Sequence, residues 1–204
     1  MARTRTKPPE VRRRDILDAA RKSLIARGYH DVHLDDVAAH ARVSKGALYL
    51  HFKDKESIFA AVLEDVIDRL EERLEALPAN GTAQEALTQM AAEMLDFVDE
   101  HQDFLIQFSR EKPDLCGTRA GTVLQERYAG HLRFVSGKIA RCVEEGSLRK
   151  HDPALGGMFL ISLVRMFMLQ KIMARTKGAL RPKSGQLMDL FLHGLGGRGA
   201  GHHA

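Results

Sequence analysis

The segment GYHDVHLDDVAAHARVSKGALYLHFKDK, which runs from Gly28 to Lys55, decides how this chain folds. Its apolar spacing predicts one short helix over 34–41 and a second that begins at Ser44 and ends near Leu50 or Phe52. Serine is a favoured N-cap because its side chain accepts a hydrogen bond from a backbone N–H of the first turn. Only two residues separate the helices, so we expect a tight turn and a steep helix crossing.

The second of these helices has an exposed side that is nearly bare. Gly46 and Ala47 lie there, and a glycine inside a helix costs about 1 kcal/mol relative to alanine, so its presence calls for a reason. Apolar residues of both helices and of the turn between them can pack the two helices together: Val37, Ala38, Val43, Leu48 and Phe52. Hydrogen-bond donors frame the bare side: Lys45, Tyr49, His51 and Lys55. A bare helix edge framed by donors suits close approach to DNA bases and phosphates, so the pattern indicates a helix-turn-helix over 33–52.

The charge is concentrated at the same end of the chain. Residues 1–55 hold thirteen Lys and Arg against seven Asp and Glu, whereas the remainder holds 18 basic and 20 acidic residues. A basic end on a nearly neutral body favours contact with a polyanion at that end. A basic tail that only aids solubility is the alternative reading of the charge alone.

The rest of the chain also has helical periodicity. A first helix is expected over 10–27, followed by Gly28 in the left-handed conformation that often ends a helix. Asp54 caps a fourth helix that ends at Pro78, Asn80 and Gly81. Further helices are predicted over 82–101, 102–111, 117–145, 153–175 and 184–195. Because no strand-like alternation occurs, we expect an all-α fold with a flexible basic arm (1–9), a helix-turn-helix domain (10–70), an effector-binding and dimerisation domain (71–196) and a disordered tail (197–204).

The run VSKGALYLHFKDKE from Val43 to Glu56 resembles the recognition-helix signature of the TetR family of transcriptional regulators. Upstream, ILDAA at 16–20, Gly28-Tyr29 and Val37-Ala38 also match that family at its usual spacing. The resemblance covers about Glu10 to Leu70; beyond it only the helical pattern and the length agree. The resemblance implies an N-terminal helix-turn-helix domain and a C-terminal helical bundle that binds a small molecule and dimerises.

The resemblance also implies a role for each residue of the recognition helix. Ser44 would cap the helix and contact phosphate, and Lys45, Gly46, Ala47 and Leu50 would face the major groove. Tyr49 and His51 would bond to phosphates, and Lys55 would hold the DNA backbone. Arg42 would also reach phosphate. Arg3, Arg5 and Lys7 either enter the minor groove or are simply solvated.

Two positions depart from the family pattern. His33 stands where a Thr or Ser usually caps the helix at Leu34, which weakens that cap; Asp35 and Asp36 compensate if they stabilise the positive end of the helix. Arg42 stands where a turn glycine is common, and a left-handed backbone there would cost on the order of 1 kcal/mol.

The predicted helix over 153–175 is apolar nearly all round, so most of its sides must be covered. The resemblance implies a four-helix dimer interface made by the last two long helices of each subunit, with these residues: Met158, Leu163, Met166, Phe167, Leu187, Leu190 and Phe191. Gly156-Gly157 would allow close approach at the start of that contact. Burial of the helix within a monomer is the alternative. A homodimer with two identical heads would bind a palindromic operator in double-stranded DNA.

A second apolar set could line an adaptable cavity for a small-molecule effector: Met90, Met94, Phe97, Phe104, Phe108, Tyr128 and Phe134. Each of these residues could equally be plain core. Arg165 would meet an anionic ligand, pair with an acid such as Glu111 or Glu126, or point to solvent.

Several other classes of protein fit the sequence poorly. The longest run without a charge, 153–164, is shorter than the roughly 18 residues of a membrane span, and no secretory signal is evident. The ten histidines and Cys116 and Cys142 match no metal-ligand spacing. We therefore expect no metal, no cofactor, no enzymatic activity and a cytoplasmic location in a bacterium.

Two functions remain open at this stage. The first is a repressor that a ligand releases from its operator by favouring a dimer whose heads no longer match successive major grooves. The second is a non-allosteric architectural DNA-binding protein whose C-terminal body only dimerises.

Overall fold

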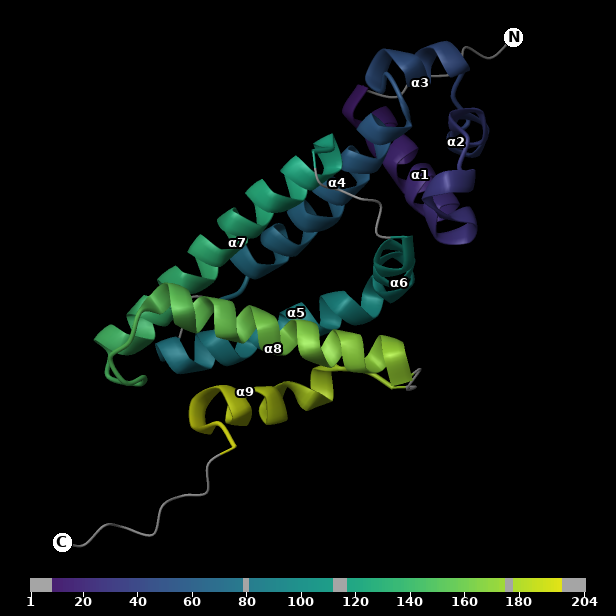
Figure 1. The fold of residues 1–204 in the computed structure, drawn as a ribbon. Coiled ribbons are helices and arrows are strands. Elements are labelled where there is room, and N and C mark those ends of the chain that lie inside the picture. The colour runs from purple at the N-terminus through teal and green to yellow at the C-terminus, as the bar shows by residue number, and fades with distance from the viewer. Residues whose placement is uncertain (1–8, 79–80, 112–116, 175–177, 196–204) are drawn as a thin grey trace, which may run out of the picture. The chain divides into compact units, whose positions relative to one another are not determined.

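The computed structural model describes residues 9–78, 81–111, 117–174 and 178–195 (Figure 1). These residues form helices and connecting turns without a strand, which confirms the all-α prediction. The helices are α1 (Pro9–Asp31), α2 (Leu34–Ala41), α3 (Lys45–His51), α4 (Lys55–Glu75), α5 (Ala83–Glu100), α6 (Gln102–Glu111), α7 (Arg119–Glu144), α8 (Pro153–Ala174), the short 3₁₀ helix η1 (Arg181–Lys183) and α9 (Ser184–His193). Residues 1–8 of the expected basic arm, the tail 197–204 and Cys116 lie outside the described residues.

The chain divides into two compact units, each made of two stretches. The first contains residues up to Arg69 together with Asp103–Arg127, and the second contains Leu70–Gln102 together with residues from Tyr128 onward. The chain first passes from one unit to the other between Arg69 and Leu70, and the division into functional domains at 70 and 71 stays a prediction. Residues 103–127, however, group with the N-terminal residues, an association that the order of the sequence does not reveal.

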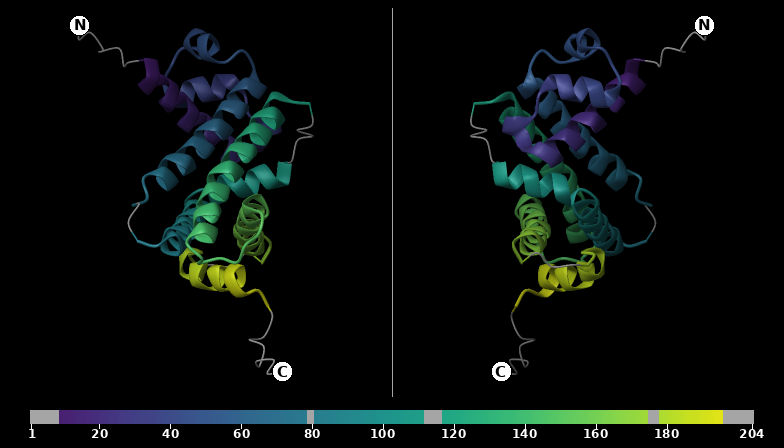
Figure 2. Two further views of the ribbon diagram at one scale, coloured as in Figure 1. Left: turned by 90° about the vertical axis from the view of Figure 1, so that its left-hand side faces the viewer. Right: turned by 90° about the vertical axis from the view of Figure 1, so that its right-hand side faces the viewer.

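The first unit has its core where α1, α2 and α3 meet (Figure 2). Ile16 and Leu17 of α1, Val37 of α2 and Leu48 of α3 are fully or almost fully buried. Gly28 has a positive φ of 83° as expected, but its ψ of 170° is extended, and one more helical turn follows it, to Asp31. Glycine tolerates this conformation because it has no Cβ.

The turn between α2 and α3 places Arg42 in the left-handed conformation, a possibility that the sequence left open. Arg42 lies in the left-handed region at φ 56° and ψ 41°, and Val43 donates its backbone N–H to Ala38 at 3.0 Å. At the start of α3, Ser44 Oγ accepts the backbone N–H of Ala47 at 3.2 Å, which confirms the predicted N-cap. His33 makes no side-chain cap for α2, as the departure from the family pattern implied.

The first half of α4 is attached to α6 and α7 inside the same unit. Glu56 Oε1 accepts the backbone N–H of Arg119 at 2.6 Å, and Arg127 pairs with Asp68 at 2.7 Å. The rings of Phe59 and Phe108 stack with centroids 6.1 Å apart. Within the first unit, α4 is therefore held to the beginning of α7 as well as to the helices α1–α3.

The second unit is built around α5. Leu87, Ala91 and Leu95 of α5 are completely buried, and α8 and α9 add Leu160 and Leu187 to the same core. Asp99 of α5 pairs with Lys171 of α8 and also accepts the backbone N–H of Leu180. This carboxylate holds the end of α8 and the approach to α9 against α5.

Helix α8 is buried along one side and exposed along the other. Its buried residues include Leu160, Val164 and Phe167, whereas six large apolar side chains on it are exposed: Leu155, Met158, Phe159, Met166, Leu169 and Met173. Among the described residues, α8 is the one helix long and apolar enough to cross a membrane. A single helix of this kind is also typical of a helical core, and Arg165 stands in its middle.

The glycine pair of α8 faces α7 within the protomer, so the expectation that it serves the dimer contact is wrong. A Cβ at Gly157 would lie 2.7 Å from Ser136 Oγ and 3.3 Å from the Ser136 backbone nitrogen. At Gly156 a Cβ would lie 2.9 Å from Ile139. Both glycines are needed because α8 crosses α7 too closely for larger residues.

We predict that Gly157→Val destabilises the protein by about 2 kcal/mol, because overpacking a close helix crossing forces the backbone apart. The urea midpoint of unfolding measures this change. Gly137→Ala in α7 is the control: a Cβ there meets nothing within 4 Å, so it should raise stability by up to about 1 kcal/mol through helix propensity. Equal shifts of the midpoint in the same direction would contradict the close packing.

Candidate nucleic-acid interface

The two sides of α3 differ sharply in exposure. Leu48 is 0% and Phe52 4% exposed, whereas Tyr49 is 49% and Leu50 87% exposed. Ser44, Lys45, Gly46 and His51 are also exposed, and Ala47 is half-buried. Burying Leu48 and Phe52 fixes the rotation of the helix, so the predicted DNA-contact residues share the outer side. We call Ser44, Lys45, Gly46, Ala47, Tyr49 and Leu50 the front of α3.

The centre of this front is open. A Cβ built on Gly46 meets no other atom within 4 Å, so packing within the protein does not explain the glycine. A glycine that costs helix stability and relieves no internal clash allows something outside the protein to approach the backbone.

Two acidic residues of α2 hold basic side chains beside the front. Lys45 Nζ donates to Asp35 Oδ2 at 2.5 Å, and Arg27 pairs with Asp36. The hydrogen bond to Asp35 is the main cause that raises the pKa of Lys45. The sequence showed these acids only as residues that favour the start of α2. The packing of α2 against α3 brings Asp35 to Lys45, and its packing against α1 brings Asp36 to Arg27.

Lys55, at the start of α4, is attached to the end of α1. Its Nζ donates to the backbone oxygen of His30 at 2.5 Å and lies 4.8 Å from the centroid of the Tyr29 ring. Burial, with smaller contributions from Glu56 and Asp54, raises the pKa of Tyr29. Lys55 thus joins α4 to α1 in the unbound protein, and its role as a phosphate contact stays a prediction. Arg42 is exposed at the turn.

The residues predicted to line an effector cavity are divided between the two units. Met90, Met94 and Phe97 are buried in the second unit, together with half-buried Phe134 and exposed Tyr128. Phe104 and Phe108 belong to the first unit, where their rings stack with centroids 6.3 Å apart. Arg165 is exposed on α8. Of this set, Met90 lines a small recess of about 120 Å³ whose wall also includes Leu74, Leu77, Ala86, Lys138 and Arg141.

The residues predicted for a dimer interface lie at different depths. Met158 and Met166 are exposed, and Leu190 and Phe191 are half-buried. Leu163, Phe167 and Leu187 are buried within the protomer and offer a partner little surface. The prediction omitted four exposed residues of the same helix, namely Leu155, Phe159, Leu169 and Met173. The sequence could not separate the buried side of α8 from its exposed side, because the helix carries apolar residues on nearly every side.

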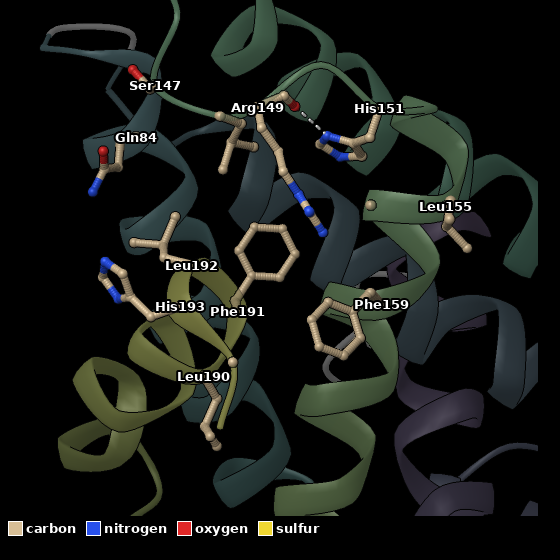
Figure 3. Close-up of a pocket in the computed structure, with 13 residues that line it drawn as sticks. Gln84, Ser147, Arg149, His151, Leu155, Phe159, Leu190, Phe191, Leu192 and His193 are labelled. Atoms are coloured by element: carbon tan, nitrogen blue, oxygen red, sulfur yellow. Dashed lines mark hydrogen bonds between the residues drawn. The ribbon is translucent and has the colours of Figure 1, made fainter. Parts of the chain in front are cut away.

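The exposed side of α8 adjoins a hollow of about 850 Å³ at the end of α9 (Figure 3). The rings of Phe159 and Phe191 stack in it with centroids 5.7 Å apart, and the Arg149 side chain points toward them from the α7–α8 loop. His151 donates from Nδ1 to the backbone oxygen of Arg149 at 2.7 Å. Leu190 also lines the hollow, so part of the predicted dimer set is gathered here.

Within the part of the chain that the structure describes, no group of three His, Cys, Asp or Glu residues could hold a metal ion. Burial raises the pKa of the Cys142 thiol, and Glu145 adds to the effect. A buried, protonated thiol reacts poorly with oxidants.

Comparison with known proteins supports this picture of the N-terminal helices. The family model described as "Bacterial regulatory proteins, tetR family" matches residues 16–62. An uncharacterized HTH-type transcriptional regulator of Bacillus subtilis, YhgD, is 29% identical over 157 residues, which is 74% of this chain and 80% of that protein.

Two solved structures of regulators share the fold. FadR from Bacillus subtilis, solved in complex with stearoyl-CoA, matches with a TM-score of 0.76 and 22% identity over 90% of this chain and 99% of that one. FadR from Bacillus halodurans, a fatty acid degradation regulator, gives a TM-score of 0.80 and 18% identity over 94% and 98% of the two chains. The family match over 16–62, which spans α1 to the first part of α4, identifies this segment as the N-terminal DNA-binding domain of the tetR family of bacterial regulatory proteins.

Proposed function

We propose that this protein is a repressor that binds a palindromic operator as a homodimer and leaves it when a small molecule binds its C-terminal unit. The observation that carries the proposal is the open front of α3, where Gly46 leaves the helix backbone accessible and Leu48 holds the opposite side in the core. Such a regulator acts in the bacterial cytoplasm, where the chromosome lies, and we assign it no enzymatic role.

In this proposal, α3 lies in the major groove with Gly46 at its closest point to the bases. Lys45 donates to guanine O6 or N7, and Ala47 or Leu50 contacts a thymine methyl group. Tyr49, His51, Arg42 and Lys55 contact phosphates and set the docking of the head without selecting the sequence. The 87% exposure of Leu50 supports this assignment, because a large apolar side chain in water gains from a partner surface.

Gly46→Leu tests the close approach directly. The side chain has open space in the free protein, so we expect thermal stability to be unchanged or higher, while affinity for a selected operator falls at least about tenfold, by analogy with the 1–3 kcal/mol cost of one lost base contact. Fluorescence anisotropy with a labelled duplex measures the affinity. Gly137→Leu, also at an open helical glycine, should leave affinity unchanged; equal losses from the two variants would count against the proposal.

The dimer interface in this proposal is the exposed side of α8, made of Leu155, Met158, Phe159, Met166, Leu169 and Met173. Successive members are one, three, four or seven positions apart, and exposed Ser162 lies between Phe159 and Met166, so the six residues share one side of the helix. Covering a stripe of large apolar side chains is favourable by roughly 25 cal/mol per Å² of apolar surface. Phe191 of α9 extends the surface beside Phe159, and we expect the hollow at Arg149 to receive partner side chains. An isologous contact of this kind gives the two heads the symmetry of a palindrome.

Met166→Glu should convert the dimer to a monomer, because a carboxylate at the centre of the stripe would be buried without a partner. Sedimentation equilibrium measures the assembly, and operator affinity should fall together with dimer formation. Leu50→Glu makes the same kind of change at an exposed apolar residue outside the stripe and should leave the dimer intact. A Met166→Glu protein that still sediments as a dimer would place the interface elsewhere.

For the effector we propose an acyl-CoA thioester, the class of ligand in the FadR structure from Bacillus subtilis. The support in this chain is the recess of about 120 Å³ at Met90, which has room for only a part of such a ligand; its wall is apolar at Leu74, Leu77 and Ala86, and it carries Lys138 and Arg141 together with one acid, Glu75. An apolar recess with basic groups suits a molecule with an apolar chain and anionic groups. Helix α4 carries the response, because it begins in the first unit, where Glu56 and Asp68 attach it to α7, and ends in the second.

Stearoyl-CoA is therefore expected to weaken operator binding about 5- to 150-fold, the usual range of allosteric coupling. An anisotropy titration with operator duplex at a series of stearoyl-CoA concentrations measures the coupling. Stearate alone and CoA alone are the controls for the two halves of the ligand, and Lys138→Ala/Arg141→Ala should reduce the response without changing affinity for DNA in its absence. Operator binding unaffected by acyl-CoA of any chain length would rule out this effector class.

A further inference from the structure

The Lys45–Asp35 ion pair joins the first residue of α3 to the first turn of α2. The Nζ and Oδ2 atoms are 2.5 Å apart, and the two side chains keep 66% and 52% of their exposure. The pair thus lies on the front of α3, in the path of any DNA that approaches it.

Of the two acids that begin α2, Asp35 is the one that acts on Lys45. Asp36 pairs with Arg27 of α1, and its backbone oxygen accepts a hydrogen bond from Nδ1 of His40 at 2.8 Å. The two carboxylates are adjacent in sequence and both lie in the first turn of α2, but they hold cations from different helices.

A closed ion pair presents little net charge to a phosphate backbone. The Lys45 ammonium group keeps two N–H donors while it is paired, but the adjacent carboxylate offsets its positive charge. Lys45 acts as a full cation toward guanine or phosphate oxygens only if it leaves Asp35, and the free energy of the pair is then lost on binding. Opening also leaves the Asp35 carboxylate near the negative charge of DNA, which adds to the cost.

We propose that Asp35 sets the DNA affinity of the head by holding Lys45 in an ion pair that opens when α3 enters the groove. Asp35 is then a negative determinant of DNA binding that acts through Lys45. The pair offsets the positive charge of Lys45 until hydrogen-bond acceptors on DNA replace the Asp35 carboxylate.

A double-mutant cycle on the full-length protein tests this proposal. Dissociation constants are measured at low salt for wild type, Asp35→Asn, Lys45→Ala and the double variant, with a mixed-sequence duplex of about 30 base pairs, long enough for two half-sites one helical turn apart. The product of the constants for wild type and double variant, divided by the product for the single variants, should be about two to five, the range of exposed ion pairs. Asp35→Asn alone should strengthen binding, and the coupling should shrink as salt screens the pair.

The matched control is the same cycle with Asp36→Asn in place of Asp35→Asn. It removes the neighbouring charge without touching Lys45, so its coupling to Lys45→Ala should be close to one. Thermal melts verify that each variant is folded. A ratio near or below one for the Asp35 cycle would overturn the proposal, because the pair would then survive on DNA. An equal ratio in both cycles would also overturn it, because the coupling would then be general electrostatics.

Discussion

The structure depends on the burial of one side of a seven-residue helix. Leu48 and Phe52 of α3 are held in the core with Ile16, Leu17 and Val37, and this packing fixes the rotation of α3 about its axis. The left-handed Arg42 sets the crossing, since Val43 turns back to donate to Ala38 immediately after it. Once these constraints are met, Gly46 and Leu50 must face outward. The surface that we propose as the DNA-binding surface is therefore exposed because the opposite side of the helix is buried.

Ion pairs and hydrogen bonds then determine how much positive charge the exposed side of α3 and its neighbours present. Three basic side chains of this unit have partners in the structure: Lys45 and Arg27 pair with Asp35 and Asp36 of α2, and Lys55 donates to the end of α1. The N-terminal unit therefore presents less free positive charge to DNA than its number of Lys and Arg residues indicates. Affinity for DNA depends on which of these contacts DNA can replace, and so on geometry as well as net charge.

Much of the architecture could be predicted from the sequence because it depends on local physics. Apolar periodicity predicted the helices of the described residues within a few positions, and the Ser44 cap followed from its side chain. The left-handed backbone of Arg42 was only a possibility at the sequence level. The unforeseen features depend on tertiary contacts. The Asp35–Lys45 pair needs the crossing angle of α2 and α3, and the attachment of Lys55 to His30 needs α1 and α4 to meet. Likewise, residues 103–127 join the first unit through Phe108, Arg119 and Arg127, which no periodicity could reveal.

The most direct test of the account is a map of backbone amide chemical shifts in the ¹⁵N-labelled protein as a duplex is added. The largest changes should occur at Ser44 through Leu50, with Gly46 prominent, while amides of the α5 core at Leu87 and Leu95 stay nearly unchanged. Changes concentrated elsewhere, with Gly46 and Ala47 unaffected by saturating DNA, would show that the exposed front of α3 is not the surface that meets DNA.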